Sequence, residues 1–224
     1  MRAPVSVVIP TLDAAADLGP CLAALGEGLQ AGLLRELVIS DGGSTDATRA
    51  VADEAGAIWV SGPPGRGGQL GRGVAASEGD WLLVLHADTW LAPGWSEAVL
   101  AGIARGAPGY FRLRFRANGP APAWVASWAN LRARALGLPF GDQGLLVSRK
   151  DYDAAGGYPE IPLMEDLALA RALPRPRALN ATAETGAERY QAHGWLAQGA
   201  ANLWRQARFL AGADPERLAR GYRR

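Results

Sequence analysis

Short apolar runs alternate with longer amphipathic segments along the first half of this chain. The runs are rich in Val, Ile and Leu, are too short for helices, and cover residues 5–9, 36–40, 57–60 and 81–85. The last of them predicts a strand that is buried on both faces of a sheet. The segments between the runs have helical spacing, as in Leu18, Leu22, Leu25 and Leu29. This alternation predicts an α/β fold with a mostly parallel sheet, right-handed crossovers and flanking helices.

The second half of the chain is less regular. Residues 109–116 alternate apolar and basic side chains, which is typical of a half-exposed antiparallel or edge strand. The remaining patterns predict strands over 144–148 and 178–183, a short helix to about 155, a basic tail over 217–224, and helices over 93–105, 123–138, 161–173 and 195–210. No repeat or low-complexity linker interrupts the chain, so we expect one domain over residues 1–224 with a helical C-terminal extension.

Charge and cysteine content narrow the class of protein. The 224 residues carry 23 Lys and Arg against 22 Asp and Glu, and a net charge of +1 gives no indication of a nucleic-acid partner. The single cysteine, Cys21, excludes an internal disulfide framework and lies on an apolar helical face, where a core residue is expected. No apolar stretch has the length of a transmembrane helix, and the first residues do not resemble a signal peptide. We therefore expect a soluble cytoplasmic protein.

Polar loops follow the first, second and fourth predicted strands, at residues 10–13, 41–46 and 86–89. In open α/β sheets the carboxyl ends of parallel strands meet at one edge, and ligands bind in the crevice beyond it. Asp88 would suit a divalent metal that holds a diphosphate there, although it could instead cap a turn. Asp41 precedes two glycines that let a ligand approach, and its carboxylate could accept hydrogen bonds from a ribose or a base. The alternative for Asp41 is an Asx-turn with Ser44 or Thr45 as the helix N-cap.

Two further segments carry candidate chemistry. Residues 65–73 are glycine-rich, but their spacing and their place after the third strand fit neither a dinucleotide fingerprint nor a P-loop. We expect a short helix only after them, with Arg66 and Arg72 as mobile cations beside a phosphate-bearing ligand. The alternative is two ordinary solvated arginines. Glu165 and Asp166 open a predicted helix, where two carboxylates could simply complement the helix dipole.

Taken in order, these motifs resemble the family 2 glycosyltransferases, which have the GT-A fold and use nucleotide-diphospho-sugars. The resemblance is carried by VVIPT at 7–11, DGGSTD at 41–46, the acidic motif after the fourth strand, and Glu165-Asp166 before a helix. A narrower resemblance, to the arsenosugar-biosynthesis-type subgroup, is carried by LHADT at 85–89, GDQG at 141–144 and PLMED at 162–166. Each motif is weak alone, but their joint order covers nearly the whole chain.

The resemblance implies roles for the matching positions. Asp88, the last acid of a D-x-D-type motif, would bind Mg²⁺ or Mn²⁺ on the diphosphate with His86 beside it. Asp166 would be the general base, with Glu165 next to it. The nucleotide would contact Pro10, Thr11, Asp13, Asp41, Gly42, Arg66, Gln69 and Ala87. The chain departs from the family pattern where His86 replaces the first acid, which would favour Mn²⁺, and where Gly71 replaces an Asn.

These roles imply a metal-dependent, inverting glycosyltransferase that moves a sugar from a UDP- or GDP-sugar to an acceptor hydroxyl. The metal and the arginines would stabilise the leaving diphosphate while the carboxylate takes the acceptor proton. Residues 1–92 would bind the nucleotide-sugar, residues 93–194 would form the acceptor and catalytic half, and residues 195–224 would be the helical extension.

Other interpretations stay open. The replacement at His86 also fits a non-catalytic nucleotide-sugar-binding protein, and sugar nucleotidyltransferases share the βαβ architecture. The helix over 123–138 and the Arg-rich C-terminal helices could lie on the inner face of a membrane, although helices packed on the sheet are the preferred interpretation. His193 could approach the metal, but a surface histidine is preferred. The residues identify neither the acceptor nor a homo-oligomer.

Overall fold

The computed structural model describes residues 3–220 and contains one eight-stranded sheet with the strand order β3-β2-β1-β4-β7-β6-β8-β5. The strands are β1 (Val5–Thr11), β2 (Leu34–Asp41), β3 (Ile58–Ser61), β4 (Trp81–Val84), β5 (Trp90–Leu91), β6 (Gly109–Phe115), β7 (Leu145–Ser148) and β8 (Arg177–Thr185). The pairs among β1, β2, β3 and β4 are parallel, as is the β6–β8 pair, whereas β7 and β5 run antiparallel to their neighbours. The predicted mostly parallel α/β sheet is confirmed.

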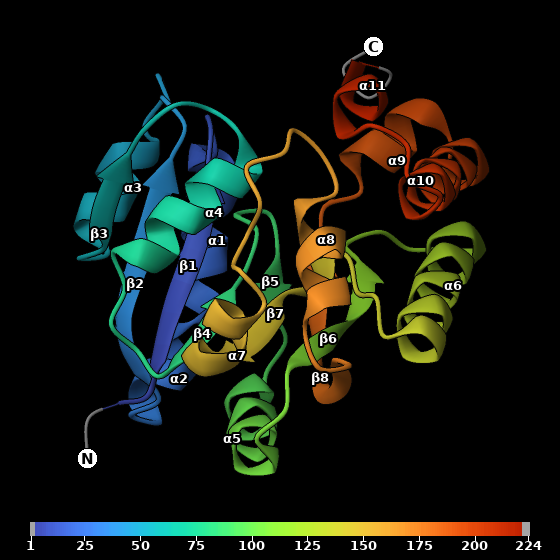
Figure 1. Ribbon diagram of the computed structural model, residues 1–224. Helices are drawn as coiled ribbons and strands as arrows, with labels where there is room; N and C mark the ends of the chain where they lie inside the picture. Colours follow the sequence, from blue (N-terminus) through green and yellow to red (C-terminus); the bar gives the residue numbers. More distant parts are fainter. Residues whose placement is uncertain (1–2, 221–224) are drawn as a thin grey trace.

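Helices cover both faces of this sheet (Figure 1). They are α1 (Ala15–Ala24), α2 (Gly26–Gln30), α3 (Thr48–Glu54), α4 (Arg66–Ala75), α5 (Trp95–Arg105), α6 (Pro120–Leu136), α7 (Arg149–Ala154), α8 (Glu165–Ala172), α9 (Glu188–His193), α10 (Trp195–Leu210), α11 (Pro215–Arg220) and the 3-10 turn η1 (Gly141–Gln143). The helices α1, α3 and α5 pack on one face, and α4, α7 and α8 pack on the other. The helices α6, α9 and α10 form a separate group beyond β6.

Consecutive strand residues enter two different apolar cores. Val7 and Leu83 pack with α1 and α5, whereas their neighbours Val8 and Leu82 pack with α4 and α7. All four side chains are fully buried. The apolar runs therefore mark strands that are covered on both faces, as predicted for 81–85. Cys21 is buried in the first of these cores, as expected.

The register brings the predicted loops to one edge of the sheet. Thr11 lies opposite Asp41 and Val8 lies opposite Val84, so the loops at 10–13, 41–46 and 86–89 leave their strands side by side. The antiparallel strand β7 begins at this same edge, because Leu145 pairs with Val84. Topology therefore adds the turn η1, just before β7, to the loops that the sequence placed there.

The glycine-rich stretch differs from the prediction, because most of it is the helix α4. A Cβ at Gly73 would lie 2.6 Å from Val8 Cγ1 and 3.2 Å from Ser40 Cβ, and a Cβ at Gly67 would collide with the Pro159 carbonyl. The glycines thus let α4 lie directly on the sheet and against the 159–165 segment. Glycine disfavours helices intrinsically, and here close packing overrides that preference.

Other local predictions also need correction. The strand β6 alternates as predicted, with Arg112 and Arg114 exposed, and it runs antiparallel to β7, but it is not an edge strand because it lies between β7 and β8. The N-cap of α3 is Ala47, not Ser44 or Thr45. The helix α6 turns its Trp and Leu stripe outward, with Trp124 59% and Trp128 46% exposed.

Two further predictions concern the basic C-terminal tail and the absence of a transmembrane helix. The last four residues of the predicted basic tail, 221–224, lie outside the described residues. Within residues 3–220, no helix combines the length and the apolar character that crossing a membrane requires.

Candidate active site

Asp41 ties the loops after β1 and β2 together. Its carboxylate, buried with its residue, accepts hydrogen bonds from the Gly43 and Ser44 amides at 2.7 and 2.8 Å and from the Thr11 and Ser44 hydroxyls at 2.9 and 2.5 Å. Burial favours a higher pKa for Asp41, but these hydrogen bonds outweigh burial and hold the pKa below its usual value. The Asx-turn is confirmed, without the N-cap role predicted for Ser44 or Thr45. A ribose contact with this carboxylate would have to replace one of these bonds.

Asp13, in the loop after β1, and Gln69, on α4, also hold the loops after β1 and β2 together. Asp13 has a φ of 48°, and its Oδ1 accepts a hydrogen bond from the Thr45 amide at 2.8 Å. Gln69, on α4, donates to the carbonyls of Thr11 and Ser40 at 2.7 and 3.0 Å. The loops after β1 and β2 and the helix α4 therefore form one hydrogen-bonded unit at the edge of the sheet.

The two arginines of the glycine-rich stretch have different surroundings. Arg66, at the start of α4, is 43% exposed and lies 3.4 Å from Glu165 Oε1 through its Nη1 atom. Arg72 folds back, and its Nη2 donates to the Pro63 carbonyl at 2.8 Å. Of the two predicted cations, only Arg66 reaches the pocket described below.

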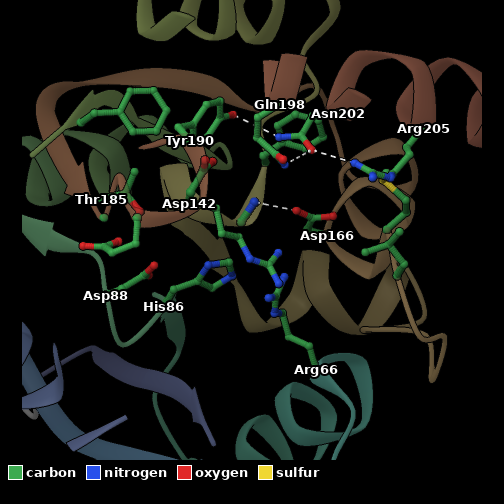
Figure 2. A pocket seen from close by; sticks show the side chains of 18 of the residues that line it. Arg66, His86, Asp88, Asp142, Asp166, Thr185, Tyr190, Gln198, Asn202 and Arg205 are labelled. Atoms are coloured by element: carbon green, nitrogen blue, oxygen red, sulfur yellow. Dashed lines mark hydrogen bonds between the residues drawn. The ribbon is translucent and has the colours of Figure 1, made fainter. Parts of the chain in front are cut away.

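His86 and Asp88 follow β4 and lie at the floor of that pocket (Figure 2). The His86 ring packs on Gly141, where a Cβ would lie 2.5 Å from His86 Nε2. Burial lowers the pKa of His86 to about 3, with a further lowering from Arg66, so the imidazole is neutral at physiological pH. Arg116 donates to the Asp88 carbonyl and stacks 3.7 Å from the Trp90 ring centre, which fixes the Asp88 backbone.

Glu165 and Asp166 begin α8 next to a strained residue. Met164, the N-cap, has a φ of 69°, a conformation that is unfavourable for a side chain of this kind. Asp166 Oδ2 accepts a hydrogen bond from the Gly141 amide at 2.6 Å, which ties α8 to η1. Burial and the neighbouring Asp166 raise the pKa of Glu165 to about 7, although Arg66 acts in the opposite direction.

A pocket of about 240 Å³ gathers these groups between the two halves of the chain. Its lining includes Arg66, His86, Asp88, Glu165 and Asp166 (Figure 2). The other predicted nucleotide residues lie in the adjoining strand ends, loops and α4 and do not line it: Pro10, Thr11, Asp13, Asp41, Gly42, Gln69 and Ala87. His193 is exposed and outside the lining, as preferred from the sequence.

The far wall of the pocket comes from α9 and α10, which the sequence left without a role. Asn202 Nδ2 donates to the Tyr190 hydroxyl at 3.1 Å, and Gln198 Nε2 donates to Asn202 Oδ1 at 3.0 Å. Arg205 Nη1 also donates to Asn202 Oδ1, at 3.2 Å. Polar residues at helical spacing look like a solvated face in a sequence, and only the fold shows that they face a pocket (Figure 2).

Asp142 is a second residue that the sequence left without a role. It lies on η1 and lines the pocket, and burial together with Asp166 and Asp88 raises its pKa to about 7 against the attraction of Arg132. The GDQG motif pointed to its segment but not to its function. Over residues 3–220, no group of three or more His, Cys, Asp or Glu side chains is placed to hold a metal ion.

The chain resembles proteins of known activity in sequence. The model of glycosyl transferase family 2 matches residues 6–144. A glucosyl-3-phosphoglycerate synthase of Mycolicibacterium paratuberculosis is 38% identical over 38% of this chain, and the match spans only 28% of that protein.

Solved structures show the same fold. The Mycobacterium tuberculosis glucosyl-3-phosphoglycerate synthase in complex with phosphoglyceric acid has a TM-score of 0.52 and 25% identity, covering 82% of this chain and 70% of its own. S. aureus TarS has a TM-score of 0.62 and 15% identity, covering 82% of this chain and 36% of its own. The α/β fold is therefore the GT-A fold that the resemblance implied. Because the family model spans more than half of its residues, this chain belongs to glycosyl transferase family 2.

Proposed function

We propose that this protein is a metal-dependent, inverting glycosyltransferase that moves a sugar from a nucleotide-diphospho-sugar to an acceptor hydroxyl. The observation that carries the proposal is one pocket at the carboxyl edge of the sheet, lined by Asp88 and His86 on one side and by Asp166 on another. Ligands of open α/β sheets bind at this edge. Arg66 adds a cation for the leaving diphosphate.

The available ligands fit a divalent metal that is shared with the substrate. Asp88 offers a carboxylate and His86 a neutral imidazole, while the described residues provide no third protein ligand in a cluster. Mg²⁺ and Mn²⁺ sites of this kind complete their coordination with phosphate oxygens and water. The metal would neutralise the growing charge on the diphosphate, and Arg116 would hold the Asp88 backbone for it.

Asp166 is the proposed general base. The Gly141 amide orients its carboxylate, and a carboxylate within reach of the acceptor hydroxyl can take its proton during attack. Glu165 is buried beside Arg66 and would hold that arginine rather than touch the acceptor. With one base and one metal, a single in-line displacement inverts the anomeric carbon.

The relatives suggest the donor, and finer details stay predictions. The M. tuberculosis glucosyl-3-phosphoglycerate synthase has been crystallised with Mn²⁺ and UDP-glucose, which favours a UDP-sugar and a metal here as well. We propose residues 1–92 as the nucleotide-sugar half, 93–194 as the acceptor and catalytic half, and 195–224 as the helical extension. The hexosyl group, the arsenosugar subgroup and a cytoplasmic location stay predictions from the sequence, which identifies neither the acceptor nor a homo-oligomer.

Thermal unfolding with UDP, GDP, CDP and dTDP, each with and without Mn²⁺, tests the donor site. A ligand that binds only the folded protein stabilises it according to its concentration over Kd. We expect one nucleotide to raise Tm only with Mn²⁺, and Asp88→Ala to abolish the increase. Asp166→Asn should keep the increase but lower transfer by about 10²- to 10⁴-fold. Full transfer activity in a folded Asp166→Asn protein would refute the base assignment.

The same assays separate two alternatives. A non-catalytic nucleotide-sugar-binding protein would show the increase in Tm without turnover on any acceptor. A sugar nucleotidyltransferase would release pyrophosphate from a nucleoside triphosphate. No nucleotide effect under any metal condition would remove the basis for all three functions.

We also propose that α6 and α10 dock on an anionic membrane surface. Trp124, Trp128 and Leu131 project from one face of α6 and are 59%, 46% and 57% exposed. On α10, Leu196 and Trp204 are 66% and 65% exposed. Arg134 on α6 and Arg208 on α10 are exposed, and neither helix contains Asp or Glu. An exposed Trp and Leu face with basic flanks is the composition of helices that lie in a lipid interface.

The packing of the two helices makes these side chains one face. A Cβ at Gly199 would lie 3.9 Å from Val125, and Arg132 Nη1 donates to Gln206 Oε1 at 2.9 Å. In both contacts the α10 residue follows the α6 residue by the same number of positions, so the two helices run in the same direction where they touch. On two parallel helices, the exposed Trp and Leu side chains of α6 and of α10 then lie on the same side of the contact between the helices. The pocket-lining residues of α10 lie on the other side.

Co-sedimentation with phosphatidylglycerol vesicles tests this contact. We expect binding to the anionic vesicles, weaker binding to phosphatidylcholine vesicles, and loss of binding in Trp124→Gln/Trp128→Gln. Leu29→Gln, at a 65% exposed leucine on α2, is the matched control and should bind like the wild type. If the double variant changes the oligomeric state instead, the face joins two copies of the chain and the membrane proposal is wrong.

A further inference from the structure

Asp142 is a half-buried residue that the proposed mechanism does not use. It lines the pocket and lies between Tyr190 and His86 in the view of Figure 2. Its Oδ1 atom is buried, and no residue within the described range 3–220 donates a hydrogen bond to it. An unsatisfied buried acceptor costs about 1–3 kcal/mol. A group that enters the pocket would recover this energy by donating to Oδ1.

The neighbouring side chains do not supply that donor. Among the cations, Arg132 lowers the pKa of Asp142 most. However, Arg132 Nη1 donates to Gln206, and the guanidinium stacks 3.7 Å from the Phe140 ring centre. Arg132 Nη2 is also buried without a partner in the described part of the chain. Asp88 and Asp166, which also act on Asp142, are acceptors when ionised. The described side chains therefore leave this acceptor to a group that enters the pocket.

The place of Asp142 suggests which ligand group this is. In an in-line displacement, the sugar ring lies between the diphosphate, which Asp88 would hold through the metal, and the base Asp166. Asp88, Asp142 and Asp166 line the same pocket, so Asp142 faces the space that this ring would enter. That space is where the transferred ring has to sit.

We infer that Asp142 binds a hydroxyl group of the transferred sugar ring. This inference rests on the proposed function and adds to it a residue that recognises the donor sugar. A hydroxyl is neutral and donates a charge-assisted hydrogen bond to a carboxylate. A phosphate or carboxylate group at this position would be repelled by Asp142, Asp88 and Asp166 together.

Calorimetric titration of wild type and Asp142→Asn with UDP and with UDP-glucose, both with Mn²⁺, tests the inference. If another nucleotide raises Tm in the panel above, that nucleotide and its glucose conjugate are used. Loss of a hydrogen bond to a charged group should weaken UDP-glucose binding by about 10- to 100-fold and leave UDP binding unchanged. Monodeoxy analogues of UDP-glucose identify the hydroxyl, because wild type should discriminate against one of them and Asp142→Asn should not.

A stability measurement separates sugar binding from a structural role. Asn has the shape of Asp, and removing a poorly compensated buried charge should leave Tm unchanged or raise it. Asp153→Asn, at an exposed position on α7, is the control and should bind both ligands like the wild type. Equal losses for UDP and UDP-glucose, or no loss for either, would overturn the inference. If wild type binds no nucleoside diphosphate at all, the proposed function fails first and the inference fails with it.

Discussion

Three titratable groups of the pocket have pKa values that burial shifts in opposite directions. Burial raises the pKa of Glu165 and of Asp142 to about 7, whereas burial lowers the pKa of His86 to about 3. In each case burial disfavours the charged form, because the pocket is poorly solvated. Each shift also makes the stability of the fold depend on pH.

We expect the free energy of unfolding of the metal-free protein to fall between about pH 6.5 and about pH 8. In this window the folded protein loses protons from Glu165 and Asp142 that the unfolded chain has already lost, so stability decreases as pH rises. His86 acts in the opposite direction, but its contribution is nearly complete above its unfolded pKa of 6.5. The net decrease should be about 1 kcal/mol.

Urea unfolding in EDTA at the two pH values measures this decrease. Glu165→Gln/Asp142→Asn should remove it, while Asp153→Asn, at an exposed site, should retain it. A wild-type stability that is equal or higher at the upper pH would show that these carboxyl groups do not have raised pKa values.

Single residues were predictable where a motif carried them, and not where tertiary contacts gave them their place. Asp88 and Asp166 could be identified because each directly follows a recognisable strand or opens a helix. Arg116 looked like one more basic residue of an alternating strand, yet it holds the Asp88 carbonyl. Asp142 becomes noticeable only through the burial of its Oδ1 atom, which no sequence pattern encodes.

At the scale of elements, α4 shows how glycine can serve packing in a helix. Gly73 faces the sheet, where a Cβ would lie 2.6 Å from Val8, whereas a Cβ at Gly71 would meet nothing within 4 Å. The two positions belong to the same helix and differ only in what surrounds them. Substitutions at these two positions therefore distinguish the effect of close packing from that of helix propensity.

We expect opposite effects of alanine at these two positions. Gly73→Ala should lower the free energy of unfolding by about 1–3 kcal/mol, because the methyl group forces α4 away from β1 and β2. Gly71→Ala should raise it by about 0.5–1 kcal/mol, because alanine stabilises a helix without a contact to disturb. Urea unfolding measures both, and a stabilised Gly73→Ala protein would contradict the packing argument.

The place of a helix or strand could be predicted where its apolar residues are the buried ones, and less well where they are exposed. The strands β1, β2 and β4 have the apolar runs of fully covered strands, and their predicted positions hold. The apolar stripe of α6 predicted a face that packs inward, but the helix contacts β6 and α10 with other positions and leaves Trp124 and Trp128 exposed. Periodicity identifies an apolar face without identifying what covers it.

At the scale of the whole molecule, the pocket joins segments that are far apart in the sequence. The loops after β1, β2 and β4 meet because parallel strands end together, which the strand–helix alternation predicts. The same alternation does not predict that β7 runs antiparallel to β4. It also does not predict that α9 and α10 line the pocket. The sequence therefore indicated the proposed donor side of the site and missed the opposite wall.

We expect the two sides of the pocket to have separate functions, donor binding on one side and acceptor binding on the other. Asn202 lies on α10, contacts Tyr190, Gln198 and Arg205, and is far in sequence from the proposed donor half. We expect Asn202→Ala to keep the Mn²⁺-dependent increase of Tm with the nucleotide, and to lower transfer about tenfold or more through a higher KM for the acceptor. The reason is that loss of Asn202 removes the hydrogen bonds that order the wall facing Asp166.

Asn180→Ala, at an exposed site on β8, should leave both properties unchanged and controls for general damage. Steady-state kinetics with varied acceptor, beside the nucleotide panel, measures the two functions on the same preparation. If Asn202→Ala loses the nucleotide effect as well, α10 contributes to donor binding and the proposed boundary between the two halves is wrong. If it retains wild-type KM and kcat, the wall formed by α9 and α10 closes the pocket without taking part in acceptor binding, and the acceptor has to be sought along η1 and α8 instead.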